Sequence, residues 1–267
     1  MDRNLMVVLT LACLLAFTVH RNVRGENRSY DGSGNNLLNA TWGAAGTPLP
    51  RMSSAAYGDL ISTPAGSSRP NPRQISNDAV AQIVMIPNTH EMTDWVFQWG
   101  QFMDHDLDLT VSAAPTELFN IAIPAGDPIF DPLNTGAQVM PFPRSKYDPS
   151  TGTGAGNPRQ QINEVTSYID ASMVYGSDLG RATALRTLSG DGKLLTSAGN
   201  LMPLNTMGLP NGAAGGNPAD FYLAGDVRSN EQVGLTAAHT LFVREHNRLA
   251  GEIAAANVGW SDEQIYQ

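Results

Sequence analysis

Hydrophobic residues recur with helical spacing in only a few stretches of this chain of 267 residues. Apolar positions three or four residues apart predict a helix from Asn77 to about Met85 and another from Thr93 to about Leu109. A shorter helix is expected to start at Ser177, as its N-cap, and to reach Leu185. Two capping-box patterns, at Ser229–Gln232 and Ser261–Gln264, predict a long helix that ends near Ala255 and a last one near Gln267.

The segments between these helices have the composition of loops. Residues 26–77 show no sustained apolar period, and residues 110–160 contain eight prolines. The whole chain has 26 glycines and 17 prolines, and residues of these two types interrupt regular structure. The pattern therefore predicts a mainly α, loop-rich protein, and neither an internal repeat nor a low-complexity linker divides it.

The N-terminus has the pattern of a secretory signal peptide. Arg3 precedes an uncharged run from Leu5 to Val19, which is shorter than the ~20 apolar residues that span a bilayer. Val23–Gly25 resembles a cleavage site, so we expect residues 1–25 to be removed and the mature protein to be secreted, with an uncleaved anchor as the alternative. The only cysteine, Cys13, lies in this run, which excludes a disulfide-stapled scaffold, and no later segment approaches membrane-spanning length.

The charge balance excludes one class of function. Lys and Arg number 16 against 25 Asp and Glu, which gives a formal net charge of −9. A protein that binds nucleic acid through a basic surface needs the opposite balance. Nucleic acid is therefore not an expected partner.

The densest group of chemically active side chains is WGQFMDHDLD, residues 99–108. On a helix, Gln101, Asp104, His105 and Asp108 fall on one face, while Asp106 points roughly 100° away. The aromatic residues around them argue against full exposure of this helix. An acidic, solvated face with an incidental histidine would nevertheless give the same pattern.

Oxygen-bearing side chains alternate along TSYIDAS, residues 166–172. In an extended backbone such side chains point the same way and can converge on a hard cation, although an edge strand with a polar face looks the same. A calcium-binding EF-hand loop around Asp106 is excluded. Leu109 and Pro115 stand where its glycine and its final glutamate belong.

A third segment, Gly225–Glu231, leads into the predicted long helix. Arg228 lies there at a turn beside a helix start, where it can provide a fixed positive charge or simply pair with Asp226 or Glu231. On the helix, His239 and His246 share a face but lie two turns apart, whereas helical metal-chelating pairs are four residues apart. We therefore expect both histidines to be structural.

Together these segments resemble the animal-type haem peroxidases, the group that includes myeloperoxidase and peroxidasin. The matching stretches occur in the family's order and cover nearly all of the chain after the signal peptide. They are NATWG (39–43), GQFMDHDLD (100–108), RQQIN (159–163) with TSYIDASMVYGS (166–177), and AGDVR (224–228) through Thr240 with REHNR (244–248). Several motifs in one order are far more specific than any single one.

The resemblance implies a distal haem site. His105 would be the distal histidine, which takes a proton from hydrogen peroxide and returns it to the departing oxygen. Arg228 would stabilise the charge that develops as the O–O bond breaks. Gln101, one turn before His105 on the same helical face, would form a hydrogen bond to water or to a halide.

The family also implies how haem b and Ca²⁺ are held. Asp104 and Glu231 match two carboxylates that form ester links to the haem, while Gln232 stands where myeloperoxidase has a methionine that forms a third link. That third link is not expected here, so the resemblance does not extend to the high potential associated with chloride oxidation. The expected calcium ligands would tie the distal helix to the 166–172 loop, and they are Asp106, Thr166, Tyr168 through its carbonyl, Asp170 and Ser172.

The function implied is that of a haem-dependent peroxidase, which reduces hydrogen peroxide and oxidises a halide, thiocyanate or a small organic donor. A fatty-acid dioxygenase of the same superfamily and a non-catalytic extracellular calcium-binding or adhesion module are the alternatives. In the family the proximal haem ligand is a histidine well downstream of the catalytic arginine, and neither His239 nor His246 matches its position. We therefore expect residues 26–267 to be the N-terminal, distal part of a haem peroxidase domain, with the fold incomplete at its C-terminus.

Overall fold

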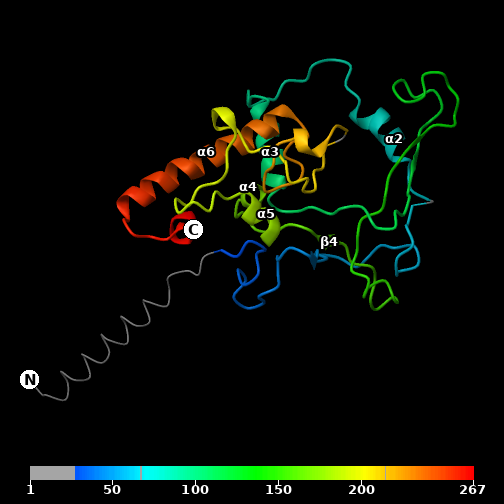
Figure 1. Ribbon diagram of the computed structural model, residues 1–267. Helices are drawn as coiled ribbons and strands as arrows, with labels where there is room; N and C mark the ends of the chain where they lie inside the picture. Colours follow the sequence, from blue (N-terminus) through cyan, green and yellow to red (C-terminus); the bar gives the residue numbers. More distant parts are fainter. Residues whose placement is uncertain (1–27, 67, 214) are drawn as a thin grey trace, which may run out of the picture.

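The computed structural model describes residues 28–66, 68–213 and 215–267. Helices and very short strands are separated by long loops (Figure 1). The helices are α2 (Pro72–Ile75), the π-helical η1 (Ser76–Val80), α3 (Trp95–Asp104), α4 (Ser172–Tyr175), α5 (Leu179–Ala184), the 3-10 turns η2 (Ala198–Asn200) and η3 (Pro218–Asp220), α6 (Val233–Ala256) and α7 (Asp262–Tyr266). The strands are β1 (Thr47–Pro48), β2 (Ile121–Ala122), β3 (Val139–Met140) and β4 (Ile162–Asn163). The prediction of a mainly α, loop-rich protein is confirmed.

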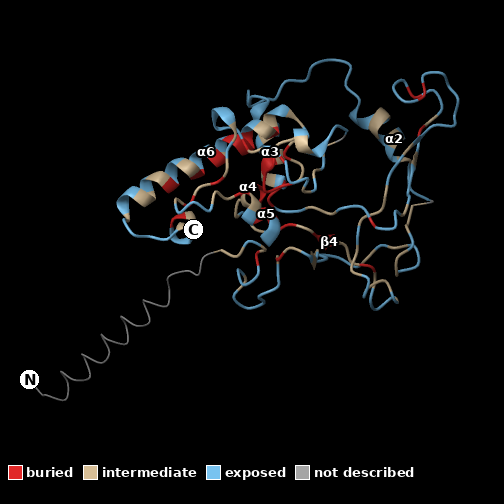
Figure 2. Ribbon diagram, viewed as in Figure 1, coloured by how far each residue is buried: buried red, intermediate tan, exposed pale blue. Residues whose placement is uncertain are grey.

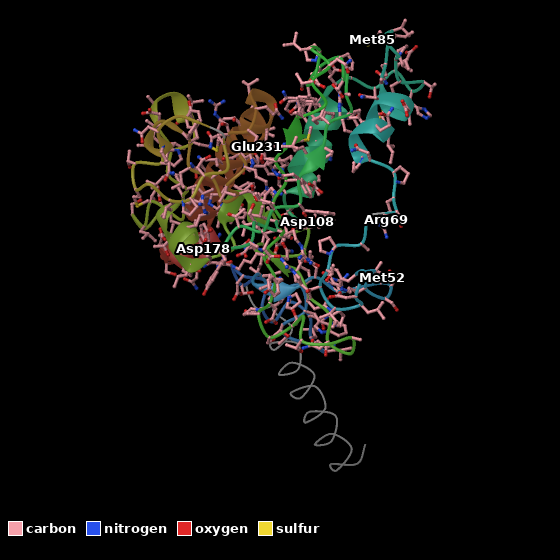
Figure 3. All side chains as sticks on the ribbon, turned by 90° about the vertical axis from the view of Figure 1, so that its right-hand side faces the viewer. Met52, Arg69, Met85, Asp108, Asp178 and Glu231 are labelled. Carbon is pink, nitrogen blue, oxygen red and sulfur yellow. The ribbon has the colours of Figure 1, made fainter. Side chains whose placement is uncertain are left out.

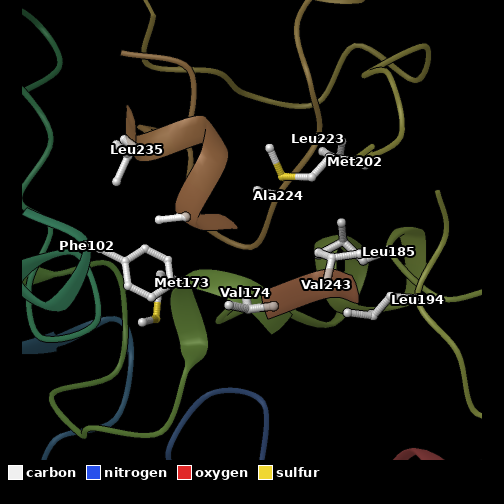
Figure 4. Packing of buried hydrophobic residues seen from close by; sticks show 11 residues of the cluster. Phe102, Met173, Val174, Leu185, Leu194, Met202, Leu223, Ala224, Leu235 and Val243 are labelled. Carbon is white, nitrogen blue, oxygen red and sulfur yellow. The ribbon is translucent and has the colours of Figure 1, made fainter. Parts of the chain in front are cut away.

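The hydrophobic core lies where α3 and α4 pack against α6, and buried residues gather there (Figure 2). Phe102 of α3 is fully buried and contacts Phe242 of α6, with 4.8 Å between the ring centroids. Figure 4 shows the buried cluster, which consists of Phe102, Met173, Val174, Leu185, Leu194, Met202, Leu223, Ala224, Leu235, Ala238 and Val243. Because α6 supports both α3 and α4, the 99–108 and 166–177 segments are fixed relative to each other.

Two small antiparallel sheets connect the loops. β1 pairs with β4, and β2 pairs with β3. The buried side chain of Asn163, in β4, accepts a hydrogen bond from the N–H of Leu109 and donates one to the carbonyl of Leu107. The chain that leaves α3 is thereby fastened to the strand that precedes the 166–172 loop.

The helix predicted at residues 77–85 is wrong in position. The Asn71 side chain accepts hydrogen bonds from the N–H groups of Arg73 and Gln74, so α2 begins at Pro72, a residue that suits the first helical position. The helical path continues as η1 and ends at Val80. The apolar residues that follow are exposed, and Ile83 is 98% exposed. The capping residue, rather than the apolar spacing, determines where this helix begins.

α3 is shorter than the helix predicted at residues 93–109, since it ends at Asp104. The next residues turn because the carboxylate of Asp106 accepts hydrogen bonds from the loop that begins at Asp170. Asp108 therefore does not lie on the helical face predicted for it. The aromatic residues of α3 are also less buried than expected, because only Phe102 is buried while Trp95 and Trp99 are exposed.

The predicted N-caps of two later helices are each displaced. α5 begins after Asp178 rather than Ser177, and α6 begins after Gln232, whose side chain accepts a hydrogen bond from the N–H of Gly234. The hydroxyl of Ser229 instead accepts a hydrogen bond from the side chain of Asn230 within the preceding turn. The capping box at Ser261–Gln264 is confirmed, since both of its reciprocal hydrogen bonds are present at the start of α7.

The Asp178 cap predicts a modest effect on stability. Its carboxylate accepts a hydrogen bond of 2.8 Å from the N–H of Arg181. Asp178→Ala is therefore expected to lower the free energy of unfolding by about 1 kcal/mol, whereas Asp178→Asn, which can still cap the helix, stays close to the wild type. Urea unfolding followed by circular dichroism measures both. Equal losses in the two variants would contradict the assignment of this cap.

The predicted signal peptide, residues 1–25, lies outside the described residues. Among the residues that are described, no helix is both long and apolar enough to cross a membrane.

Candidate functional site

Arg228 and His105 lie together at the end of α3. The Nη2 group of Arg228 donates hydrogen bonds to the carbonyl oxygens of His105, at 3.3 Å, and Asp108, at 2.8 Å. Arg228 is only partly buried, while His105 is 4% exposed. Two residues that are 123 positions apart in sequence are thus brought side by side, and the arginine closes the turn that ends the helix.

Asp226 holds the guanidinium of Arg228. Its carboxylate accepts hydrogen bonds from the backbone N–H of Arg228 at 2.7 Å, from Nε at 2.9 Å and from Nη2 at 2.8 Å. Burial acts to raise the pKa of Asp226, but the hydrogen bonds and positive charge of Arg228 outweigh it and lower the pKa. The pairing of Arg228 with Asp226, proposed from sequence as the simpler alternative, is present, and it leaves the arginine in place beside His105.

The imidazole of His105 is buried among charged groups. Its Nδ1 atom lies 3.9 Å from Oδ1 of Asp226, too far for a hydrogen bond, and has no partner among the described residues. Burial lowers the pKa of His105, and the charge of Arg228 lowers it further, against the opposing effect of Asp226, Glu231 and Asp104. The ring is therefore neutral near pH 7, with one nitrogen able to accept a proton.

Gln101 lies in a chain of polar side chains that joins α3 to the start of α6. Its amide nitrogen donates to Oε2 of Glu231 at 2.9 Å, and its amide oxygen accepts from Gln232 at 3.0 Å. Gln232 also donates to Gln98. Figure 3 labels Glu231 and Asp108, both of which are exposed, as is Asp104. Gln101, His105, Asp104 and Glu231 thus all lie in the same region around α3.

Asp106 is fully buried against the 166–172 loop. Its carboxylate accepts hydrogen bonds from the N–H groups of Asp170 and Ala171, each at 3.0 Å, and from the hydroxyl of Ser172 at 2.9 Å. Burial raises the pKa of Asp106, the hydrogen bonds lower it, and the negative charge of Asp170 raises it further, so that the net shift is upward. Protein hydrogen bonds therefore join α3 to this loop, and the calcium link that the resemblance implies stays a prediction.

Three of the other predicted calcium ligands, Thr166, Asp170 and Ser172, lie beside the carboxylate of Asp106. The hydroxyl of Thr166 lies 3.0 Å from Oδ1 of Asp170 and 3.2 Å from the hydroxyl of Ser172. Asp170 also pairs with Arg28, whose Nε lies 2.8 Å from Oδ2. The phenol of Tyr168 points elsewhere and donates to the carbonyl of Trp42. Sequence reasoning did not foresee Arg28, because nothing in a local pattern places it beside residue 170.

The two histidines of α6 differ in their surroundings. His246 is satisfied, since its Nδ1 lies 3.1 Å from the hydroxyl of Tyr175 and its Nε2 lies 2.9 Å from the carbonyl of Gly192. His239 is fully buried edge-on to Phe102, and neither of its ring nitrogens has a partner among the described residues. His246 is structural, as expected. His239 was also expected to be structural, but it is a buried polar group without a hydrogen-bond partner among the described residues, and the charges of Asp226, His105 and Arg228 act on it.

His239 predicts a pH dependence of stability. Burial lowers its pKa to about 4, from an ordinary value of about 6.5. Below pH 6.5 the unfolded chain therefore binds a proton that the folded chain does not bind, so stability falls as the pH decreases toward 4, by up to about 3 kcal/mol from this residue. Urea unfolding at several pH values measures this loss.

The variant His239→Leu isolates that contribution. It is expected to lose less stability than the wild type between pH 6.5 and 4, and to be at least as stable at pH 7, because it removes two unpaired polar atoms. The same slope of stability against pH in both proteins would show that His239 does not cause the effect.

Comparison of the sequence with known proteins finds one family and several relatives. The model of the animal haem peroxidase family matches residues 27–267. The peroxidasin homolog of Mus musculus is 36% identical over 306 residues, an alignment that covers 96% of this chain and 20% of that protein. Dual oxidase 2 of Homo sapiens is 36% identical over 251 residues, covering 91% of this chain and 16% of that protein. The chain thus spans a fifth or less of the length of these curated relatives.

Solved structures show the same fold. Peroxidase A from Dictyostelium discoideum matches with a TM-score of 0.79 and 31% identity, over 90% of this chain and 49% of that one. A fatty acid alpha-dioxygenase of Arabidopsis thaliana matches with a TM-score of 0.69 and 21% identity, over 90% of this chain and 33% of that one, which is a likeness of fold alone. From the family match over nearly the whole chain and this shared fold, the protein belongs to the animal haem peroxidase family.

Proposed function

We propose that residues 26–267 supply the distal half of a haem peroxidase site, which reduces hydrogen peroxide and oxidises a halide, thiocyanate or a small organic donor. The single observation that carries this proposal is the meeting of His105 and Arg228, which lie 123 residues apart in sequence, at the end of α3. One is a neutral base, and the other is a permanent cation held in a fixed orientation. Peroxide heterolysis needs both kinds of group.

The side chains around α3 suit haem. Two exposed carboxylates, Asp104 and Glu231, would hold its periphery through ester links, and the amide of Gln101 would bind water or a halide beside His105. Gln232 cannot form the sulfonium link of a methionine, and its amide is already bonded to Gln98 and Gln101. When bound, haem supplies the iron centre at which peroxide is reduced.

The residues of this chain would then move one proton and stabilise one charge. The Nε2 atom of His105 would accept the proton of hydrogen peroxide and pass it to the departing oxygen, which leaves as water. Arg228 would face the negative charge on that oxygen as the bond lengthens, and its three bonds to Asp226 keep it from reorienting.

Ca²⁺ is proposed to bind between Asp106 and the 166–172 loop. Within the described residues no group of three or more His, Cys, Asp or Glu side chains could hold a metal, so the two carboxylates of Asp106 and Asp170 need further oxygen ligands. The hydroxyls of Thr166 and Ser172 lie within about 3 Å of these carboxylates, a spacing that suits oxygens sharing one Ca²⁺. The carbonyl of Tyr168 would complete the set. Arg28 would have to yield its contact with Asp170.

Haem binding and turnover test the proposal directly. We expect the full-length protein, in a form that includes the family's proximal histidine, to develop a Soret band when titrated with haem and then to oxidise a small donor only when hydrogen peroxide is added. Calcium-dependent folding without haem uptake would favour the non-catalytic module instead. We also propose, from the pattern of residues 1–25, that the mature protein is secreted.

A conservative variant tests the role of Arg228. Arg228→Lys keeps the charge but cannot make the parallel Nε and Nη2 bonds to Asp226. The lysine ammonium is then no longer held toward the departing oxygen, and losing one charge-assisted hydrogen bond to that oxygen would raise the barrier by about 1.5–3 kcal/mol, so the rate constant for reaction with peroxide is expected to fall roughly tenfold or more. The matched control is Arg244→Lys on α6, whose guanidinium binds the carbonyls of Gly199 and Asn200. Stopped-flow mixing with hydrogen peroxide measures both, and equal rates would contradict the role.

Fatty-acid oxygenation is the second candidate, supported by the structural match to a fatty acid alpha-dioxygenase of Oryza sativa at 26% identity and a TM-score of 0.69. Incubation of the haem-loaded protein with palmitic acid and dioxygen discriminates between the two. Oxygenated fatty acid as the main product would replace the peroxidase proposal.

A further inference from the structure

The carboxylate of Asp226 lies beside both proposed catalytic side chains, His105 and Arg228. It is 1% exposed and comes from the turn before α6, a different part of the chain from α3. One of its oxygens, Oδ1, accepts two hydrogen bonds from Arg228 and is also the carboxylate oxygen closest to the ring of His105, 3.9 Å from Nδ1. A single buried carboxylate therefore lies between the proposed acid–base group and the proposed charge stabiliser.

The Nδ1 atom of His105 needs a partner. It is buried and has none among the described residues, and a buried polar atom left unpaired costs about 1–3 kcal/mol. Within 4.0 Å of this ring, Asp226 provides the one carboxylate found in the described part of the chain. A shift of about an ångström or a single bridging water would give a hydrogen bond between Nδ1–H and Oδ1.

The other groups near Asp226 do not compete for it. His239 is buried nearby, but neither of its ring nitrogens has a hydrogen-bond partner among the described residues, so it does not donate to Asp226. Arg181 is buried too, but its Nη1 and Nη2 donate to the carbonyls of Ala224 and Pro210. Glu231 and Asp104 influence His105 only through their charge, and both are exposed. The negative charge of Asp226 is therefore directed to Arg228 and His105.

We propose that Asp226 is a positioning residue that fixes His105 in the tautomer with the proton on Nδ1, while it holds Arg228 in the same site. A carboxylate can only accept, so the nitrogen that faces it must carry the hydrogen, and Nε2 is left with its lone pair. A base oriented by a third, carboxylate group is a recurring arrangement in catalysis. The inference rests on the proposed function, in which Nε2 is the atom that accepts the proton of peroxide.

The tautomer of His105 can be measured by NMR spectroscopy without any measurement of enzymatic activity. In long-range ¹H–¹⁵N spectra of the full chain labelled with ¹⁵N-histidine, His105 is expected to show a protonated Nδ1 and an unprotonated Nε2 near pH 7, with His105→Gln used to assign its signals. In Asp226→Asn, whose amide no longer requires a donor at Nδ1, the pattern is expected to shift toward protonation at Nε2. Asp220→Asn, an exposed aspartate six residues earlier, should leave the spectrum of His105 unchanged.

Activity supplies the second readout. Asp226→Asn is expected to slow the reaction of the haem-loaded protein with peroxide by about 10²-fold or more, because the wrong tautomer presents N–H rather than a lone pair. A wild-type spectrum with the proton on Nε2 overturns the inference, even if Asp226→Asn fails to fold. An Nδ1-protonated His105 in a protein without peroxidase activity would instead contradict the proposed function and leave the inference standing.

Discussion

His105→Ala is expected to lower the second-order rate constant for reaction of the haem-loaded protein with hydrogen peroxide by about 10²- to 10⁴-fold, the usual contribution of a general acid–base residue. The imidazole is neutral because burial and Arg228 lower its pKa, and it lies beside the one arginine that the loop at residues 224–228 brings to α3. Alanine leaves the arginine in place but provides no atom to carry the proton. Stopped-flow absorbance after mixing with peroxide measures the rate constant.

The matched control is His90→Ala, since His90 lies in an exposed loop and its backbone N–H, not its ring, is hydrogen-bonded. It should react at the wild-type rate. Haem binding has to be compared for all three proteins, so that loss of the cofactor is not mistaken for loss of proton transfer. If His105→Ala binds haem and reacts with peroxide as fast as the wild type, the proposed mechanism is wrong.

Asp106→Asn is expected to abolish the effect of Ca²⁺ on stability and to destabilise the protein by several kcal/mol. The carboxylate accepts three hydrogen bonds of about 3 Å from Asp170, Ala171 and Ser172. An amide keeps the shape but offers only one acceptor oxygen, so buried donors lose partners at about 1–3 kcal/mol each. For the wild type, Ca²⁺ at a hundred times its dissociation constant should add about 2.7 kcal/mol to the free energy of unfolding.

Urea unfolding with added Ca²⁺ and with a chelator measures both effects. Asp108→Asn is the matched control, because its carboxylate is exposed and lies two residues along, and only its backbone carbonyl is used by Arg228. This variant should respond to Ca²⁺ as the wild type does. A normal calcium response in Asp106→Asn would place the cation elsewhere. The absence of any response in the wild type would contradict the proposed calcium site, and protein hydrogen bonds such as those of Asp106 would then link α3 to the loop without a cation.

Features that depend on neighbouring residues were predicted well from the sequence. The capping box at Ser261 forms as expected, because its two hydrogen bonds span only three residues. Gln101 and His105 share a face, because the helix that carries them sets that relation over a single turn. Periodicity was less reliable than capping, as the start of α2 shows. Asn71 and Pro72 determine that start, whereas the apolar residues at 81–85 remain exposed.

The sequence by itself therefore determined the helical character of the chain, its loop-rich composition and the residue types gathered at residues 99–108, 166–172 and 224–231, which also carry the family resemblance. Only the tertiary structure decided that Asp226, which pairs with Arg228, also lies beside His105. It also decided that α3 ends at Asp104, where the carboxylate of Asp106 binds the 166–172 loop, and that His239 is buried without a hydrogen-bond partner among the described residues. The physical reason is the separation of the contacting residues along the sequence. The contacts of His105 with Asp226 and of Asp106 with the 166–172 loop join residues 64 or more positions apart. The loop contact forms because α3 and α4 pack on the same long helix. A local pattern cannot record which distant carboxylate a buried nitrogen will face.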